Sequence, residues 1–114
     1  MIVKGYNAIA LLIPVYNGEQ TVGGVIAGCK ALDLPILVVD DGSTDDSAER
    51  IQRLAVDHFI RHRRNQGKGR ALQTGFRVAS ELGYEAVITL DCDGQHRPAE
   101  VPKFLEKFRM TQAD

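Results

Sequence analysis

The sequence predicts an α/β fold, with a mostly parallel sheet covered by helices on both faces, in a single domain over residues 1–114. Two patterns support this class. Apolar runs of strand length alternate with segments in which apolar residues recur every three or four positions, and turn-forming residues separate them. Because a strand, a helix and a second strand form a crossover, neighbouring strands are expected to run parallel.

The first strand is expected in residues 8–15, "AIALLIPV", because this apolar run is short for a helix and ends at "YNG". A helix is expected next. Its apolar side recurs at i, i+3, i+4 and i+7 before "DLP" interrupts it, and consists of Val22, Val25, Ile26 and Cys29.

The second strand and turn are expected in "ILVVDDGS", residues 36–43. Thr44 is expected to cap the second helix, with Asp45 and Asp46 near the positive end of its dipole. The expected apolar side of this helix is Ala48, Ile51, Leu54 and Ala55.

A short third strand, "DHFIRH", and a fourth, "EAVITL", are expected on either side of a third helix. Gly83 is the expected C-terminal cap of this helix. Pro98 is expected in the first turn of a fourth helix. The apolar sides of these two helices are expected to be Leu72, Gly75, Phe76, Ala79 and Leu82, and then Val101, Phe104, Leu105 and Phe108.

The composition is that of an ordinary folded domain, with 44% apolar residues, 25% charged residues and a formal net charge of -1. This balance argues against disorder and against a nucleic-acid partner. Cys29 and Cys92 lack metal-ligand spacing, so free thiols in a reducing, cytoplasmic location are expected. Neither a membrane span nor a signal peptide is expected from the sequence.

Polar loops follow each expected strand, at the edge of the sheet where ligands of such folds bind. Asp91 and Asp93 are two residues apart, so their carboxylates project to one side while Cys92 points away. Two adjacent carboxylates repel each other and favour a divalent cation, Mg²⁺ or Mn²⁺, with positions left for substrate phosphates. An acidic turn is the competing interpretation, and this motif alone does not decide between them.

Asp40 and Asp41 precede the expected helix cap. Ionised carboxylates only accept hydrogen bonds, so these two could read the N–H groups of uracil or guanine, and cytosine would fit less well. For Asp45 and Asp46 a role at the helix start is favoured.

The loop "NQGKGR" is glycine-rich and basic. Gly67 and Gly69 allow close backbone approach, and Lys68 and Arg70 could meet phosphate, although a solvated turn is favoured from this loop alone. It matches neither the phosphate loop of the NTPases nor the dinucleotide-binding fingerprint.

Aromatic residues near the strand ends have less specific interpretations. Tyr16 could lie along a nucleobase, but taken alone it is interpreted as a core residue, with Asn17 stabilising the turn. His58 and His62 are interpreted as strand or surface residues and His96 as a group at a helix start, none of them a metal ligand.

Four segments in this order, "IPVYNGEQT", "VVDDGSTDDS", "NQGKGRAL" and "LDCDGQH", resemble the family 2 glycosyltransferases of GT-A fold. Over residues 8–108 they look most like the dolichyl- or polyprenyl-phosphate sugar synthases. The resemblance implies a Rossmann-like half that binds a UDP- or GDP-sugar. It places around the base, the ribose and the donor Pro14, Tyr16, Glu19, Asp40, Asp41, Gly67 and Lys68.

The same resemblance implies that Asp91 and Asp93 are catalytic and, with Gln95, hold Mg²⁺ or Mn²⁺ against the donor diphosphate. It also implies transfer of the sugar with inversion, to a polyprenyl phosphate at a membrane surface or to a hydroxyl. A noncatalytic nucleotide-binding module is the alternative. A phospho-receiver domain is disfavoured, since the first strand ends in "PVYNGE" and not in an acidic pair.

Members of this family usually continue beyond this length, so the chain is expected to be a donor-binding portion truncated at its C-terminus. The full-length protein would then act at the cytoplasmic face of the membrane. The apolar fourth strand, "EAVITL", is expected to lack its usual covering and to favour a homodimer through an exposed sheet edge, or limited solubility.

Overall fold

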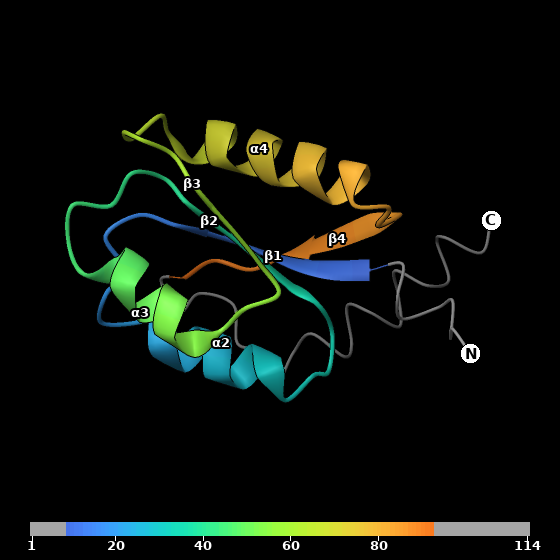
Figure 1. The fold of residues 1–114 in the computed structure, drawn as a ribbon, viewed down its shortest axis with the longest axis horizontal. Helices are drawn as coiled ribbons and strands as arrows, with labels where there is room; N and C mark the ends of the chain where they lie inside the picture. The colour runs from blue at the N-terminus through green and yellow to red at the C-terminus, as the bar shows by residue number, and fades with distance from the viewer. Residues whose placement is uncertain (1–8, 93–114) are drawn as a thin grey trace.

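The computed structural model describes residues 9–92, and in them strands and helices alternate as expected (Figure 1). The expected helix after Pro98 lies outside the described residues. In chain order the elements are β1 (Ile9–Val15), α2 (Val22–Lys30), β2 (Ile36–Asp40), α3 (Ser47–Leu54), β3 (His58–Arg61), α4 (Lys68–Glu81) and β4 (Ala86–Thr89).

The four strands form one sheet in the order β3-β2-β1-β4, and each neighbouring pair is parallel. The central strand β1 pairs with β2 on one side, where Val15 lies opposite Asp40, and with β4 on the other, where Leu12 lies opposite Thr89. The loops that follow these strands therefore meet at one edge of the sheet. The chain adds β2 and β3 on one side of β1 and then β4 on the other side. A crevice for a ligand is expected where the strand order reverses in this way.

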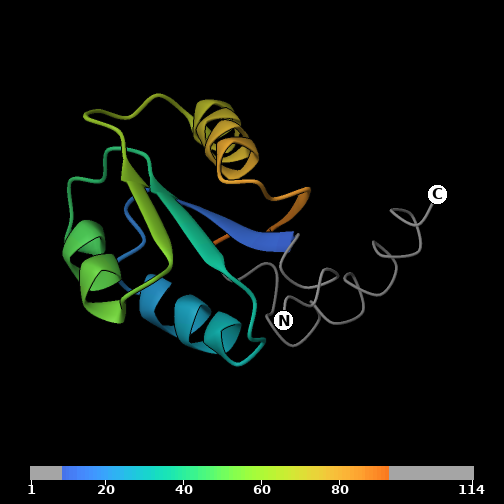
Figure 2. The same cartoon turned by 45° about the vertical axis from the view of Figure 1, so that its right-hand side comes forward.

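Helices cover both faces of the sheet, which confirms the predicted class (Figure 2). Helix α4 lies on one face, and α2 and α3 lie on the other (Figure 1). Alternate residues of β1 supply two cores: Leu11 and Ile13 pack with α2, while Leu12 packs beneath α4 with Leu37 of β2.

The first helix is as expected, because the four predicted apolar residues of α2 are its buried residues. Cys29 and Cys92 are both buried, carry free thiols and belong to the same core cluster, although the sequence separates them widely.

The expected start of the second helix is wrong. Helix α3 begins at Ser47 with Asp46 as its N-cap, two residues later than a cap at Thr44 requires. The N–H of Thr44 instead donates to Asn17 Oδ1, at 2.9 Å, which ties the residue to the loop after β1. Ala55 lies outside the helix as its C-cap, with a left-handed φ of 53°.

The expected buried side of α4 is wrong in part. Phe76 and Leu82 are 46% and 48% exposed, whereas the buried residues of this helix are Ala71, Gly75 and Ala79. Small residues recur here at intervals of four, because the helix lies so close to the sheet that bulky side chains do not fit beneath it. The helix ends as expected: Gly83 has a φ of +92° and its N–H donates to the Ser80 carbonyl.

Strand β4 is an edge of the sheet formed by residues 9–92, and its side chains at Ala86, Val87 and Ile88 are half-buried. Pairing of this edge with a second copy of the chain stays a prediction. The longest described helix, α4, has 14 residues, and no helix in the described part of the chain has the length and apolar character of a membrane span.

Candidate functional site

A pocket of about 570 Å³ lies at the edge of the sheet where the strands end. It is walled by the loop between β1 and α2, the end of β2, the start of α4 and the residues after β4. Of the predicted site residues, those that line it are Pro14, Tyr16, Glu19, Asp41, Lys68 and Asp91. Asp40 and Gly67 are not among the lining residues, and Asp93 and Gln95 lie outside the described residues.

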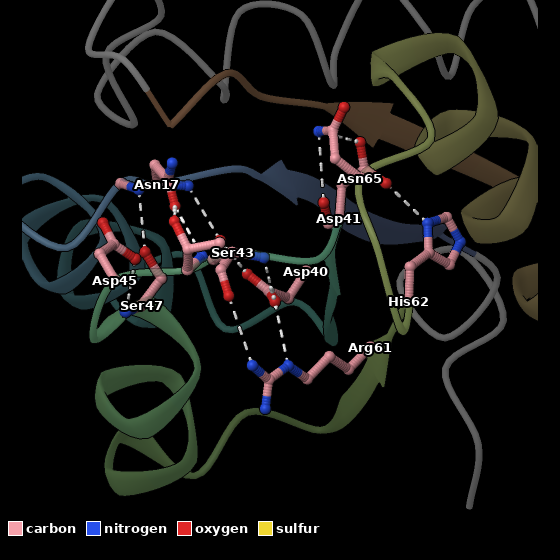
Figure 3. Close-up of polar contacts among 11 residues, drawn as sticks. Asn17, Asp40, Asp41, Ser43, Asp45, Ser47, Arg61, His62 and Asn65 are labelled. Carbon is pink, nitrogen blue, oxygen red and sulfur yellow. Dashed lines mark hydrogen bonds and ion pairs between the residues drawn. The ribbon is translucent and has the colours of Figure 1, made fainter.

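The loop after β1 is held to the loop after β2 by Asn17 (Figure 3). Asn17 has a φ of 50°, its N–H donates to Ser43 Oγ at 2.9 Å, and its Oδ1 accepts the N–H of Thr44. Asparagine tolerates this backbone conformation better than most residues. The expectation that Asn17 stabilises the turn is confirmed.

Tyr16 is not a core residue. It is 51% exposed and lines the pocket, so the core interpretation was wrong and its ring is available to a ligand. The next residues are fixed by the start of α3: the Gly18 N–H donates to Ser47 Oγ at 2.8 Å, and the Glu19 N–H donates to Asp45 Oδ2 at 3.2 Å.

Asp45 itself stabilises the beginning of α3, because its Oδ1 accepts the N–H of Ser47 at 2.9 Å. Burial by itself raises the pKa of the Asp45 carboxyl, but hydrogen bonds from Ser47 and from the Glu19 N–H bring the pKa below its ordinary value. The carboxylate therefore stays ionised and joins the two loops.

Asp40 is fully buried and supports the pocket from behind. Its carboxylate accepts hydrogen bonds from the N–H and the hydroxyl of Ser43, at 3.1 and 2.5 Å, and lies 3.4 Å from Arg61 Nε (Figure 3). A buried carboxylate needs such donors, since an unpaired buried charge is very costly.

Asp41 lies at the pocket wall and binds the loop between β3 and α4. Its Oδ1 faces His62 Nδ1 at 2.8 Å and accepts the Gln66 N–H at 2.9 Å. Its Oδ2 accepts the Asn65 side-chain amide at 3.0 Å and the Gly67 N–H at 2.8 Å. Sequence reasoning missed His62 as a partner. The signal in the sequence was that His62 comes directly after β3 and Asp41 directly after the neighbouring strand β2, at the same level of the sheet.

Lys68 and Asp91 face each other across the pocket. The Lys68 ammonium forms an ion pair with Asp91 Oδ1, with the lysine side chain 60% exposed and the aspartate side chain 18% exposed. The charge of the Asp91 carboxylate is therefore balanced by the lysine. Within residues 9–92 no group of three or more His, Cys, Asp or Glu side chains could hold a metal ion.

Cys92 also lines the pocket, and its Sγ lies 3.5 Å from Thr21 Oγ1. Burial raises the pKa of the nearby Cys29 thiol to about 11, and the Cys92 charge adds to the rise. The raised pKa keeps the Cys29 thiol protonated at neutral pH.

Comparison with known proteins gives one family. Residues 10–114 match the model of the glycosyl transferase family 2. An undecaprenyl-phosphate 4-deoxy-4-formamido-L-arabinose transferase from Pectobacterium carotovorum is 39% identical, over 86% of this chain and 32% of its own length.

A UDP-N-acetylglucosamine–dolichyl-phosphate N-acetylglucosaminyltransferase from Methanococcus voltae is 31% identical, over 86% of this chain and 46% of its own length. Among solved structures, a mycobacterial protein matches with a TM-score of 0.70 and 25% identity, over 90% of this chain and 37% of that one. The chain thus spans about a third to a half of the length of these relatives.

Proposed function

Because this chain belongs to the glycosyl transferase family 2, we propose that its pocket binds the nucleotide-diphosphate sugar donor of a glycosyl transfer. The observation that carries the proposal is that six residues predicted to meet a donor line one pocket, although they come from four separate segments. The proposed donor is a UDP- or GDP-sugar.

The base and ribose would lie against the loop after β1, where the exposed ring of Tyr16 offers a stacking surface beside Pro14 and Glu19. The diphosphate would lie toward Lys68 and Asp91, at the other side of the same pocket. Asp40 would support the base site from behind, through its bonds to Ser43.

Asp91 would hold Mg²⁺ or Mn²⁺, together with Asp93 and Gln95, which lie outside the described residues. Carboxylate and amide oxygens suit such hard cations, and the metal would take the place that the Lys68 ammonium holds at Asp91 in the ligand-free chain. When bound, the metal would neutralise negative charge that develops on the leaving diphosphate.

The proposed acceptor is a polyprenyl phosphate at a membrane surface, since the two named relatives act on undecaprenyl phosphate and dolichyl phosphate. A lipid phosphate already carries a nucleophilic oxygen, so transfer with inversion would need little help from a general base. In the whole protein this would place the domain at the cytoplasmic face of the membrane.

A noncatalytic donor-binding module is the second candidate. It is favoured by Lys68, whose ammonium neutralises the Asp91 carboxylate in the pocket and would meet a phosphate without any metal. Turnover of a donor with polyprenyl phosphate supplied would exclude it.

Calorimetry with UDP- and GDP-sugars, with and without Mn²⁺, tests the proposal. We expect binding that requires metal and is lost in Asp91→Asn and Asp93→Ala but not in Asp33→Asn, which removes an exposed acid from the loop after α2. Equal binding without metal would instead support a simple nucleotide module. If no sugar nucleotide binds, the proposal fails.

A further inference from the structure

His62 connects the pocket wall to helix α4. Its Nδ1 lies 2.8 Å from Asp41 Oδ1 (Figure 3). Its Nε2 lies 2.8 Å from Thr74 Oγ1, and its side chain is only 10% exposed. The residue follows β3 directly, and its backbone N–H donates to the Asp40 carbonyl at 2.8 Å. Both the backbone and the ring of His62 are therefore fixed.

The hydrogen-bond partners define what each ring nitrogen does. An ionised carboxylate only accepts, so Nδ1 carries the proton shared with Asp41. In the neutral ring Nε2 is then an acceptor, and the Thr74 hydroxyl donates to it. The ring has one orientation that satisfies both neighbours, and that orientation holds Asp41 Oδ1 in place.

Asp41 in turn holds the loop that begins α4. It accepts the backbone N–H groups of Gln66 and Gly67, and Gly67 is the N-cap of the helix with a φ of 101°. The next residue is Lys68, whose ammonium pairs with Asp91. A continuous series of contacts therefore runs from a buried histidine to the cation beside the predicted metal-binding acid.

We propose that His62 is a positioning residue, which acts through Asp41 to hold residues 65–67 and thereby to place Lys68 at the diphosphate side of the pocket. His62 is not among the residues that line the described pocket, so it would act on a bound donor only through Asp41. The inference rests on the proposed function for the meaning of Lys68, whereas the effect of His62 on the loop can be tested without any ligand.

Two substitutions separate this role from simple packing. The amide nitrogen of asparagine takes the place of Nδ1 and that of glutamine the place of Nε2. His62→Asn therefore keeps a donor for Asp41, and His62→Gln loses that donor and keeps a partner for Thr74. His58→Gln is the matched control, because it replaces a half-buried histidine at the start of β3 whose ring meets Tyr84 and not Asp41.

Backbone amide hydrogen exchange in the ligand-free chain is the first readout. We expect His62→Gln to speed exchange at Gln66 and Gly67 by about tenfold, the effect of losing one hydrogen bond, with little change in His62→Asn or His58→Gln. Equal acceleration in the two His62 variants, or acceleration spread over core amides such as Val38, would overturn the proposal.

Binding is the second readout. With Mn²⁺ present, His62→Gln is expected to weaken binding of UDP or GDP several-fold and to leave binding of uridine or guanosine unchanged. The diphosphate alone meets Lys68, and the Asp41 carboxylate is engaged by His62, Asn65, Gln66 and Gly67, so it does not read the base directly. An equal loss for nucleoside and nucleotide would contradict the positioning role. If the unaltered chain binds none of these compounds, the proposed function fails, and the exchange measurement still decides whether His62 holds the loop.

Discussion

Gly75 of α4 lies directly against Leu12 of β1: a Cβ built on the glycine would be 2.4 Å from Leu12 Cδ1 and 3.0 Å from its Cγ. Leu12 is fully buried, with Leu37 and Val39 of β2 in the same cluster. The missing side chain at position 75 therefore sets how closely α4 approaches the sheet. The same helix carries Lys68 at its first position, so this packing also supports the pocket.

Gly75→Ala is expected to destabilise the protein by about 1–2 kcal/mol. Overpacking a core costs roughly 1–3 kcal/mol, and the gain in helix propensity offsets about 0.5–1 kcal/mol of this. Gly24→Ala in α2 is the matched control, because a Cβ there meets nothing within 4 Å, and it should stabilise the protein slightly. Urea unfolding measures both, and a Gly75→Ala variant as stable as Gly24→Ala would contradict the packing argument.

Asn17→Ala is expected to lower the free energy of unfolding by about 2 kcal/mol. Alanine is less stable than asparagine at a positive φ by roughly 1 kcal/mol, and loss of the acceptor of the Thr44 N–H removes about 1 kcal/mol more. Asn17→Gly relieves the backbone strain but not the lost hydrogen bond, so about half of the loss should return. Thermal unfolding of the two variants separates the terms. Equal stabilities would show that the left-handed backbone contributes nothing.

Much of the fold was predictable because apolar spacing identifies buried faces where a helix buries large side chains. In α2 the residues that recur at helical spacing, such as Val22 and Ile26, are the buried ones. In α4 the same spacing predicted a buried Phe76, because apolar residues were assumed to face the core. Close packing on Leu12 requires a small residue, so Gly75 is buried and Phe76 is exposed. The strand order depends on pairings between distant segments, which local spacing does not encode.

The site was predictable to the extent that strand ends gather at one edge. That rule, with the family resemblance, predicted that Tyr16, Lys68 and Asp91 lie close together, and they line one pocket. It did not find the pairing of His62 with Asp41, because the two residues are 21 positions apart and meet only when β3 adds beside β2. Thr44 was misjudged for a similar reason, since its partner lies on another loop.

Alkaline pH is expected to destabilise the protein through Cys29. Burial first, and the Cys92 charge second, raise the pKa of this thiol from 9.0 to about 11 in the folded state. Between these values the unfolded chain releases the proton and the folded chain keeps it, so stability falls as pH rises from 9 to 11, by up to about 1.4 kcal/mol per pH unit.

The control for this effect is Cys29→Ala, which should be less stable at pH 7 because it leaves a cavity, but should lose less stability between pH 9 and 11. The difference between the two unfolding profiles isolates the thiol from other groups that titrate in this range, among them Tyr84, whose pKa burial also raises. Parallel profiles for the two proteins would contradict the assignment.

Lys68→Met is expected to affect metal binding and nucleotide binding in opposite directions. The Lys68 ammonium lies at Asp91 in the ligand-free chain, so it competes with a metal ion for the same carboxylate. Exposed pairs of this kind are worth up to about 1 kcal/mol, so its removal should tighten binding of Mn²⁺ alone by as much as about fivefold. Binding of UDP or GDP with Mn²⁺ should weaken, because a cation that would meet the phosphates is lost.

Arg77→Met is the matched control for this prediction, since it removes another exposed cation of α4 and should change neither affinity by much. Titration of Mn²⁺ followed by its paramagnetic resonance signal, and then calorimetry with the nucleotide, measures the two effects separately. The competition requires opposite shifts in one variant. If Lys68→Met weakens both ligands, the lysine supports the metal site and does not compete for it, and if it changes neither, the ion pair with Asp91 has no part in binding.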